Sequence, residues 1–291
     1  NWLVTRGEDD TEPGSLRYVL NRIEDNREAN AVITFALPSY PALIRLTNTL
    51  VLNRNVILKG PGADLLSLSG DEDDNGKPDH QILRVLAAVT LEGLTLTRGL
   101  GGQADDGASS GGAVYVGATG KLLIRYCTLS DCQAAQWGGA VDVNLGSLRI
   151  ENSLLRGNTT AAVGGLGGGA VSLYTDQTCE FVNTTFSANL QRSAAGFGGG
   201  ALYAENSDPI AMLPVTVEHC TFAENQDAAG GGSSIHANVF GTLVATRNSI
   251  FADQRGKNLE VSGAGEIVSD GGNISDDATR TILTQGGQPK D

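Results

Sequence analysis

The stretch Gly111-Gly112-Ala113-Val114 decides how this chain folds, because near copies of it recur along the sequence. The copies begin at Gly138, Gly168, Gly199 and, in degenerate form, Gly232. From position 111 onward, successive first glycines are therefore 27, 30, 31 and 33 residues apart. Self-similarity at a period of roughly 20–50 residues indicates a repeat architecture, in which each copy buries its apolar face against the next.

A second repeated phrase lies between the glycine phrases and alternates apolar with polar residues, as a half-buried β-strand does. Its copies run from Cys127 to Cys132, Ser153 to Asn158, Thr184 to Asn189, Cys220 to Asn225 and Ser249 to Gln254. Aligning them puts one large apolar residue of each copy on a single line: Leu129, Leu155, Phe186, Phe222 and Phe251. The same alignment predicts that asparagines stack and hydrogen-bond along one corner, at Asn152, Asn183 and Asn248.

These repeats predict an all-β fold, a right-handed parallel β-helix. Each coil adds one rung to several parallel sheets, about 4.8 Å from the next rung. We expect roughly nine coils of about 30 residues each. A β-propeller is the competing repeat fold, but it needs more residues per copy and periodic aromatic residues, and aromatic residues are only 5% of this chain.

The two ends of the chain differ from the repeats. Residues 14–30 predict an amphipathic helix, with apolar side chains at Leu16, Val19, Leu20 and Ile23, that covers the open end of the solenoid. We therefore expect a cap over residues 1–35 and β-helix coils over residues 36–268. Residues 269–291 lose the repeat, which indicates a closing segment or the start of a linker.

Composition narrows the classes of partner. The 291 residues carry 20 basic and 33 acidic side chains, a formal net charge of −13, which argues against nucleic acid and against anionic lipid as partners. No stretch approaches the roughly 18 apolar residues of a membrane span, so we expect no transmembrane segment. No secretory signal pattern begins at Asn1, which indicates an intracellular or an already processed chain. We expect a monomer.

The four cysteines, Cys127, Cys132, Cys179 and Cys220, show no paired Cys-x-x-Cys spacing, so no zinc site is predicted. Cys127 and Cys220 fall on one line of small residues but several coils apart, so they cannot be bridged. We expect mainly free, buried thiols, with Cys127–Cys132 as the only local pair able to form a disulfide.

The amino-terminal segments resemble a family of secreted bacterial proteins. Gly14-Ser15-Leu16-Arg17, followed by Val32-Ile33-Thr34-Phe35 and by residues 57–64, is similar to the start of right-handed β-helix proteins that carry a Cys-Ser-Leu-Arg-Glu-Ala signature. In this chain Gly14 replaces the usual cysteine, and Tyr18-Val19 replaces Glu-Ala. Residues 269–274 also resemble the closing segment of that family.

The glycine phrases and the Phe186/Asn189 and Phe222/Asn225 pairs are similar to the repeats of chlamydial polymorphic membrane proteins, which are autotransported adhesins. Both resemblances imply a secreted β-helix that lies outside the cell or on its outer surface. They imply little about chemistry, because this fold carries adhesins, lyases, hydrolases and structural fibres alike.

The acidic segment from Asp71 to Asp79, Asp-Glu-Asp-Asp-Asn-Gly-Lys-Pro-Asp, has the pattern of a calcium loop. Gly76 allows the turn, and the expected oxygen ligands are Asp71, Asp73, Asn75, the carbonyl of Lys77, and Asp79. The segment resembles the calcium loops of extracellular repeats, but it lacks the distal glutamate of an EF-hand. A bound Ca²⁺ would have a structural role here. A solvated acidic turn is the alternative interpretation.

The residues that follow the glycine phrases predict an outward ladder on one sheet face: Tyr115, Asp142, Ser172, Tyr203 and His236. Aromatic rings beside polar acceptors can stack on sugar rings, so this face predicts binding to a polysaccharide or to a glycan or protein of a cell surface. Exposed strand positions also hold tyrosine and serine through β-propensity alone, which is the alternative interpretation.

Three functions follow from these patterns. We favour an extracellular or cell-surface module for adhesion or carbohydrate binding. The alternative is a polysaccharide lyase or hydrolase. A hydrolase needs two carboxylates beside the bond, and Asp142 and Glu205 are the acids near the predicted face. Neither His219 nor His236 has an evident nucleophile partner, and no catalytic residue is predicted. The third function is a rigid spacer within a larger surface protein.

Overall fold

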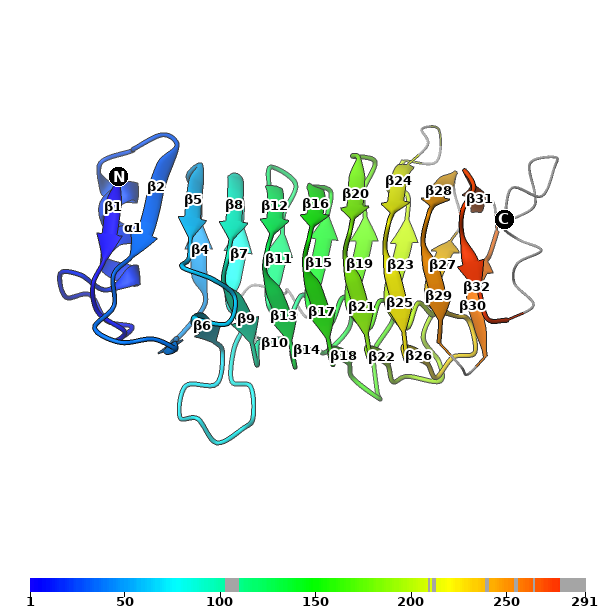
Figure 1. The fold of residues 1–291 in the computed structure, drawn as a ribbon, viewed down its shortest axis with the longest axis horizontal. Coiled ribbons are helices and arrows are strands. Elements are labelled where there is room, and N and C mark those ends of the chain that lie inside the picture. The colour runs from blue at the N-terminus through cyan, green and yellow to red at the C-terminus, as the bar shows by residue number, and fades with distance from the viewer. Residues whose placement is uncertain are drawn as a thin grey trace.

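The computed structural model describes residues 1–102, 110–208, 210, 213–238, 241–253, 256–263 and 265–277. These residues form an all-β molecule with long parallel sheets, and α1 (Leu16–Asp25) is the one helix among them (Figure 1). The arrangement is consistent with the predicted parallel β-helix and unlike the four-stranded antiparallel blades of a propeller. Over the same ranges, no helix is long and apolar enough to cross a bilayer, in line with the sequence prediction.

Three long sheets each take one strand from successive turns of the chain, and neighbouring strands pair in parallel. The ten-stranded sheet contains, in order, β1 (Trp2–Val4), β2 (Ala31–Phe35), β5 (Val56–Lys59), β8 (Ala88–Glu92), β12 (Lys121–Arg125), β16 (Ser147–Glu151), β20 (Cys179–Val182), β24 (Leu213–Glu218), β28 (Thr242–Arg247) and β31 (Glu266–Ser269). The nine-stranded sheet contains β3 (Ala42–Arg45), β6 (Leu66–Ser69), β9 (Thr95–Thr97), β13 (Thr128–Ser130), β17 (Leu154–Arg156), β21 (Thr185–Ser187), β25 (Thr221–Ala223), β29 (Ile250–Ala252) and β32 (Ile274–Ser275).

The eight-stranded sheet contains β4 (Leu50–Leu52), β7 (Leu83–Val85), β11 (Val114–Val116), β15 (Val141–Asn144), β19 (Val171–Tyr174), β23 (Leu202–Glu205), β27 (Gly232–Asn238) and β30 (Lys257–Val261). A shorter, five-stranded sheet contains β10 (Leu100–Gly101), β14 (Gln133–Ala134), β18 (Thr159–Thr160), β22 (Leu190–Gln191) and β26 (Gln226–Asp227). Along the chain, each strand of this short sheet lies between the nine-stranded and the eight-stranded sheet.

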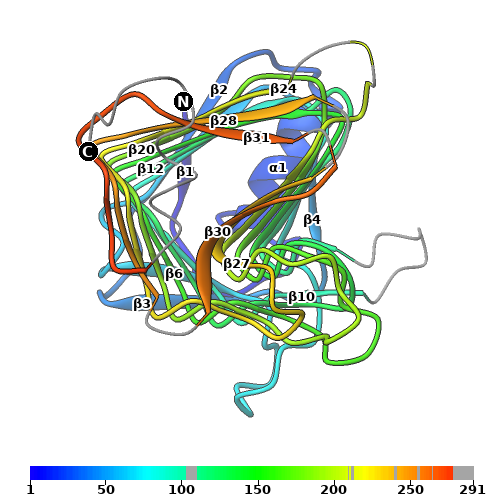
Figure 2. The ribbon, with the colours of Figure 1, turned by 90° about the vertical axis from the view of Figure 1, so that its right-hand side faces the viewer.

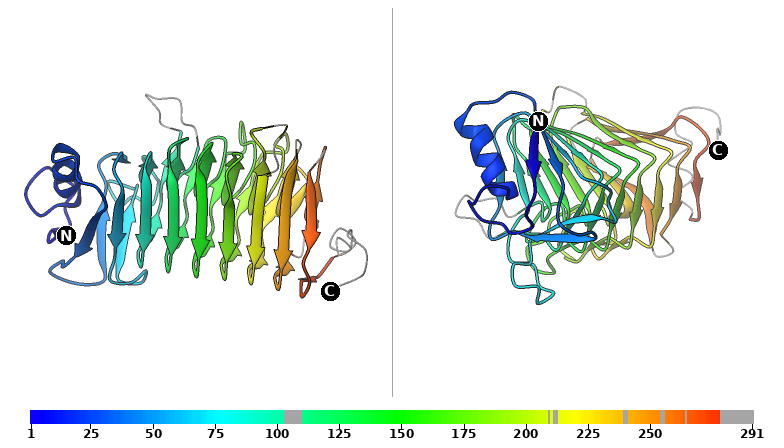
Figure 3. Two further views of the ribbon diagram at one scale, coloured as in Figure 1. Left: turned by 90° about the horizontal axis from the view of Figure 1, so that it is seen from above. Right: turned by 60° about the vertical axis from the view of Figure 1, so that its left-hand side comes forward.

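Seen along the long axis, the three long sheets lie on different sides of one interior, and the region around β10 projects outside them (Figure 2). The helix α1 lies at the amino-terminal end of the stack (Figure 3). The described part of the predicted closing segment continues the sheets through β31 and β32 as far as residue 277. Residues 278–291, the rest of that segment, lie outside the described residues.

The core follows the predicted register. Strand pairing aligns Leu129 with Leu155, Leu155 with Phe186, Phe186 with Phe222 and Phe222 with Phe251, and all five side chains are buried. The rings of Phe186 and Phe222 stack with centroids 4.6 Å apart, and those of Phe222 and Phe251 with centroids 5.2 Å apart. The spacing of the repeats therefore encodes a file of large side chains along the axis, as the sequence predicts.

The helix is shorter than predicted. It begins after Ser15, whose side chain accepts a hydrogen bond from the Tyr18 N–H over 3.1 Å. It ends at Asp25 instead of near residue 30, because Arg27 and Asn30 adopt φ values of 53° and 57°, which an α-helix excludes. Its buried face consists of Leu16, Val19 and Ile23.

The predicted asparagine corner forms on the exposed surface. Asn183 Nδ2 donates to Asn152 Oδ1 over 2.7 Å. Asn248 lies on the same line, but its Nδ2 lies 3.2 Å from Nε2 of His219, which occupies this position in the intervening coil. All four residues have φ between 47° and 55°. The residues at this corner thus adopt the left-handed backbone conformation, which asparagine tolerates better than most residues.

A second asparagine line, which sequence reasoning missed, lies inside the molecule at Asn158, Asn189 and Asn225, each 0% exposed. Asn189 Oδ1 accepts the main-chain N–H of Asn158 over 3.1 Å, and Asn225 Oδ1 accepts that of Asn189 over 3.1 Å. Each Nδ2 donates to the carbonyl of a core residue in the preceding coil over 3.0 Å. The asparagine side chains therefore provide hydrogen-bond partners for buried backbone N–H and C=O groups at this turn, which the pairing of neighbouring strands leaves without partners.

All four cysteines are free and buried, and the Cys127–Cys132 disulfide does not form. The N–H of Cys127 donates to Ser153 Oγ and that of Cys132 to Asn158 Oδ1, so the two thiols belong to different lines of the coil. Burial raises the pKa of Cys127 to about 11 and that of the other three thiols to about 12. The thiols are therefore unreactive in the folded chain.

Replacing Asn189 by alanine removes the partners of the buried Asn158 N–H and of the Leu155 carbonyl. Each unsatisfied buried group costs about 1–3 kcal/mol, so we expect the free energy of unfolding in urea to fall by about 2–5 kcal/mol. The matched control is Asn183→Gly on the exposed corner, where glycine tolerates the φ of 47° and the loss should stay below about 1 kcal/mol. Equal losses in the two variants would contradict the role given to the buried line.

A thiol titration tests the cysteine assignment. We expect a chromogenic disulfide reagent at pH 8 to react with none of the four cysteines in the folded protein and with all four after unfolding without reductant. Only two reactive thiols in the unfolded protein would mean that a disulfide is present.

Candidate functional site

The five-stranded sheet and the chain that returns from it to the eight-stranded sheet form a projection that we call the side lobe (Figure 2). In successive coils the return ends at Gly138, Gly168 and Gly199, whose φ values are 56°, 69° and 77°. A β-carbon on Gly138 would lie 2.0 Å from the carbonyl oxygen of Val141. A β-carbon on Gly168 or Gly199 would likewise clash with a carbonyl oxygen, at 2.1 Å and 2.5 Å. The repeated glycine phrase thus makes a tight return that holds the lobe against the eight-stranded sheet.

The predicted ligand ladder is in register, because strand pairing aligns Tyr115, Asp142, Ser172, Tyr203 and His236. The prediction of an open, exposed face is wrong. Asp142 and His236 are 6% exposed and Ser172 and Tyr203 are 1% exposed, while Tyr115 is half-buried. Strand alternation shows which side chains leave the core, but it does not show whether another layer covers them, and here the side lobe does so.

Two aromatic residues of the lobe, Trp137 and Phe197, cover the Tyr203 ring. The Trp137 and Tyr203 centroids are 5.2 Å apart, and Trp137 stacks on Phe197 with centroids 5.7 Å apart. Gly167, which bridges to Trp137, leaves room for this cluster, since a β-carbon there would lie 2.9 Å from Tyr203 Cγ. Sequence reasoning missed both residues, although each lies just before a glycine phrase and the chain has only 2 tryptophans.

Beside this aromatic cluster lies a cavity of about 260 Å³. Three coils supply its lining through β15, β19 and β23, and the lobe adds one ring. Tyr174 is 44% exposed and Trp137 is half-buried, so the cavity reaches the surface. We call it the aromatic pocket; its lining residues are Trp137, Asp142, Asn144, Ser172, Tyr174, Tyr203 and Glu205.

The aromatic pocket holds two carboxyl groups in different surroundings. Burial raises the pKa of Asp142 to about 7, although a hydrogen bond with Ser172 acts in the opposite direction. Glu205 Oε2 accepts a hydrogen bond of 2.5 Å from the Tyr203 hydroxyl and one of 3.4 Å from Asn238 Nδ2. Burial and the hydrogen bond to Glu205 raise the pKa of Tyr203, so the phenol keeps its proton. The structure thus brings together the two acids that the sequence placed near this face.

The interior of the lobe contains polar atoms without partners. In the described residues, five buried side-chain atoms form no hydrogen bond: Thr160 Oγ1, Gln191 Nε2 and Oε1, Asp227 Oδ2 and His236 Nδ1. A β-carbon on Gly198 would lie 2.4 Å from His236 Nδ1 and 3.1 Å from Asp227 Oδ2, so these two atoms border the same small space. Buried polar atoms of this kind are commonly satisfied by ordered water.

His236 has a hydroxyl partner that sequence reasoning missed, since its Nε2 lies 2.9 Å from Ser262 Oγ. The Ser262 hydroxyl also contacts Asn238 Oδ1 over 2.5 Å. Burial lowers the pKa of His236, so its ring is neutral near pH 7. No hydrogen bond joins Asp227 to the free ring nitrogen, and the three residues therefore do not form a Ser-His-Asp relay.

A larger hollow of about 560 Å³ lies over the ten-stranded sheet between β5 and β20. Its lining contains no aromatic residue. Of its charged lining groups, Arg149 is paired with Glu180 and also contacts Glu151, whereas Lys121 forms no ion pair with the described residues. This surface offers no stacking ring to a ligand, and the aromatic pocket is the better candidate site.

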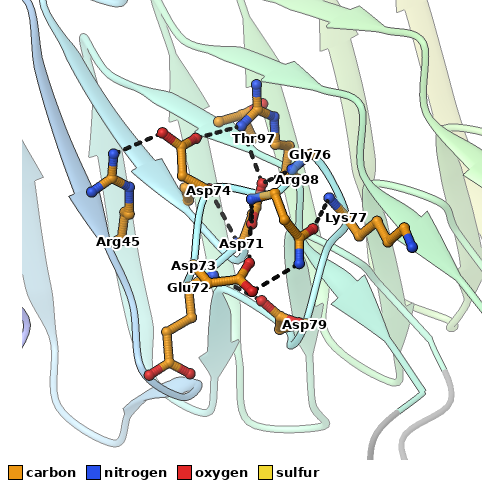
Figure 4. Close-up of polar contacts among 12 residues, drawn as sticks. Arg45, Asp71, Glu72, Asp73, Asp74, Gly76, Lys77, Asp79, Thr97 and Arg98 are labelled. Carbon is orange, nitrogen blue, oxygen red and sulfur yellow. Dashed lines mark hydrogen bonds and ion pairs between the residues drawn. The ribbon is translucent and has the colours of Figure 1, made fainter.

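The acidic loop lies between β6 and β7 (Figure 4). Carboxylate oxygens of Asp71, Asp73 and Asp79 come within 4.8 Å of one another, and Asp71 is fully buried. Asn75 Oδ1 accepts the N–H of Lys77 over 2.8 Å, so this predicted ligand also stabilises the turn. The three carboxylates are grouped as a cation site requires, and this group of described residues does not include the carbonyl of Lys77.

Arginine side chains already contribute positive charge to this loop. Arg98 Nη1 lies 3.1 Å from Asp71 Oδ2 and 3.0 Å from Asp74 Oδ1. Arg45 reaches Asp74 over 2.7 Å, and its hydrogen bond and charge are the main reasons why the pKa of Asp74 is lowered. Asp71 also accepts the N–H groups of Asn75 and Gly76. The loop therefore has an internal cation that competes with a metal ion.

Comparisons with known proteins do not identify a family. A scan against family models found none that matches this chain, and a search of curated proteins found no significant match. Function therefore has to be inferred from the geometry of the aromatic pocket.

Proposed function

We propose that the chain is a carbohydrate-binding or adhesion module and that the aromatic pocket is its binding site. The observation that carries this proposal is the convergence of three aromatic rings with two carboxyl groups in one cavity, from Trp137, Tyr174, Tyr203, Asp142 and Glu205. Rings stack on the apolar faces of sugars, and carboxyl and amide groups bind sugar hydroxyls. The pocket is smaller than most drug-sized sites of about 300–1,000 Å³, which favours a saccharide end or side branch over a long chain.

The alternative is a polysaccharide hydrolase, favoured by one specific observation. Two acids in one pocket with unlike surroundings are the arrangement of a general acid and its partner. Burial holds Asp142 partly protonated near pH 7, while Glu205 accepts hydrogen bonds from Tyr203 and Asn238. Product analysis on each saccharide that binds separates the two functions, since release of shorter chains or free sugar would establish hydrolysis.

The wider setting is also a proposal. We infer a right-handed parallel β-helix with α1 as its cap, secreted to the outside of the cell or its surface, that acts as a monomer on a polysaccharide, glycan or surface protein. Parallel strands joined by crossovers are right-handed in about 98% of known cases. The burial of Leu16, Val19 and Ile23 against the core supports the capping role. The sequence resemblance to secreted β-helix proteins supports the location.

We also propose a structural Ca²⁺ in the acidic loop. The grouping of Asp71, Asp73 and Asp79 within 4.8 Å supports it, with Asn75 and the Lys77 carbonyl as further oxygen ligands. Arg98 already neutralises part of this charge, so the affinity should be modest. In this proposal, calcium would fix the loop and would take no part in ligand binding.

Removing an aromatic ring tests the pocket. We expect Trp137→Ala and Tyr174→Ala each to weaken binding of saccharides found on a glycan array by about tenfold or more, because central aromatic contacts dominate binding energy. Isothermal titration gives the affinity of each variant. The control is Tyr126→Asn, which removes an exposed ring at a corner where the next coil has Asn152 and should leave affinity unchanged. Binding that survives both pocket variants would contradict the site, and a lack of binding to every saccharide would favour a spacer.

Calcium binding has a separate readout in stability. We expect millimolar Ca²⁺ to raise the midpoint of thermal unfolding by about 2–4 °C, the shift that about 1 kcal/mol gives in a domain of this size. Asp73→Asn/Asp79→Asn should abolish the shift, and Mg²⁺ should give a smaller one. An equal response in wild type and variant, or no response in wild type, would contradict the calcium proposal and leave Arg98 and Arg45 as the counter-charges of the loop.

A further inference from the structure

In the described part of the chain, the lining of the aromatic pocket contains acidic but no basic side chains. Asp142 and Glu205 both line it, and no lysine or arginine of the described residues lines it with them. Arg84 is near this row of the sheet, but its guanidinium lies over the Tyr115 ring, 5.0 Å from the centroid, and does not line the pocket. A ligand therefore meets negative charge without a protein cation to balance it.

The acids of the pocket keep acceptor capacity for a ligand. Both side-chain hydrogen bonds that Glu205 accepts from the described residues end on Oε2, so Oε1 accepts none from them. Among the described residues, the hydroxyl of Ser172 is the one side-chain hydrogen-bond partner of Asp142. A donor with several N–H groups and a positive charge would satisfy these oxygens better than a neutral hydroxyl, because hydrogen bonds between charged groups are about twice as strong.

The rings of the pocket favour the same kind of ligand. Trp137, Tyr174 and Tyr203 line the pocket together with the two acids, and Trp137 and Tyr174 are the rings that are partly exposed to a ligand. Ring faces attract cations within about 6 Å of their centroids, and the attraction grows when water is excluded. The rings alone would accept any sugar, but rings together with unbalanced carboxylates select for positive charge. A uronic or sialic acid would instead be repelled by Asp142 and Glu205.

We propose that the aromatic pocket recognises an amino sugar through its free, protonated amine, held between Asp142 and Glu205 while the sugar ring stacks on the aromatic residues. This inference depends on the proposed function, since it names the class of saccharide bound at the same site. N-acetylated amino sugars lack the charge and bind more weakly. Neutral sugars bind through stacking alone, and acidic sugars are excluded.

Two oligosaccharides that differ only in the acetyl groups test this inference. We would titrate the protein with the β-1,4-linked glucosamine tetramer and with the N-acetylglucosamine tetramer, at pH 7 and about 0.15 M salt, where surface attraction is screened within about 8 Å. We expect the free-amine tetramer to bind at least tenfold tighter, as charged hydrogen bonds of about 1.5–3 kcal/mol imply. Asp142→Asn and Glu205→Gln should each remove most of this preference, and the exposed control Glu224→Gln should keep it.

A permanently charged probe isolates the role of Asp142. Burial raises the pKa of Asp142 to about 7, so this carboxyl gains a proton as the pH falls below 7. The titratable groups lining the pocket or paired with Asp142 are Glu205, Tyr115, Tyr174 and Tyr203, and Arg84 and His236 lie further along the same strand row. Affinity for an N-trimethylated glucosamine tetramer should therefore rise several-fold from pH 6 to pH 8 in wild type and stay flat in Asp142→Asn. The same rise in both proteins would overturn the role of Asp142.

The outcomes separate this inference from the proposed function. If the N-acetylated tetramer binds as tightly as the free amine and Trp137→Ala abolishes binding, the amine preference is wrong and the carbohydrate site stands. If the free-amine tetramer binds equally well to wild type, Trp137→Ala and Asp142→Asn, attraction to the acidic chain explains the binding and this inference is wrong. If no saccharide binds at all, both proposals fail.

Discussion

Hydrogen bonds between parallel strands of successive coils decide which side chains meet anywhere in this molecule. The register that sets Phe186 on Phe222 in the core also sets Asp142 beside Ser172 and Ser172 beside Tyr203 on the outer face. A slip of one residue would turn every side chain of a strand to the opposite face. The aromatic pocket is therefore assembled by the same pairing that buries the core, and its geometry depends on the stability of at least three neighbouring coils.

Features that repeat in every coil were predictable from the sequence. The core line from Leu129 to Phe251 and the exposed pair Asn152–Asn183 follow directly from the spacing of the second phrase. The free thiols were predictable as well, because the register separates Cys127 from Cys220 by several coils. In each case the contacts are determined by a local pattern that recurs in neighbouring coils, so the rest of the chain is not needed to predict them.

Features that depend on a second layer were not predictable. Tyr203 follows the strand period of an outward residue, yet the side lobe leaves it 1% exposed. The lobe is built from returns of unequal length, which carry no period, and Trp137 and Phe197 occur at the end of two of them. The raised pKa of Asp142 is likewise a consequence of burial that no residue spacing encodes. The buried asparagines stand at the end of each copy of the second phrase. Their role could not be predicted, because the sequence does not show whether the turn directs their side chains into the molecule or out of it.

The rigidity of the pocket argues for selective binding in preference to a passive surface. The Tyr203 hydroxyl is fixed by Glu205 and Asn238, and its ring lies over Gly167, where no side chain competes for the space. Rings and acceptors held in one arrangement before a ligand arrives lose little conformational entropy on binding. A structural spacer would gain nothing from two carboxyl groups placed without counter-charge beside ordered rings, because their desolvation lowers stability. The unbalanced acids of this pocket are thus better explained by a ligand that neutralises them than by the needs of the fold.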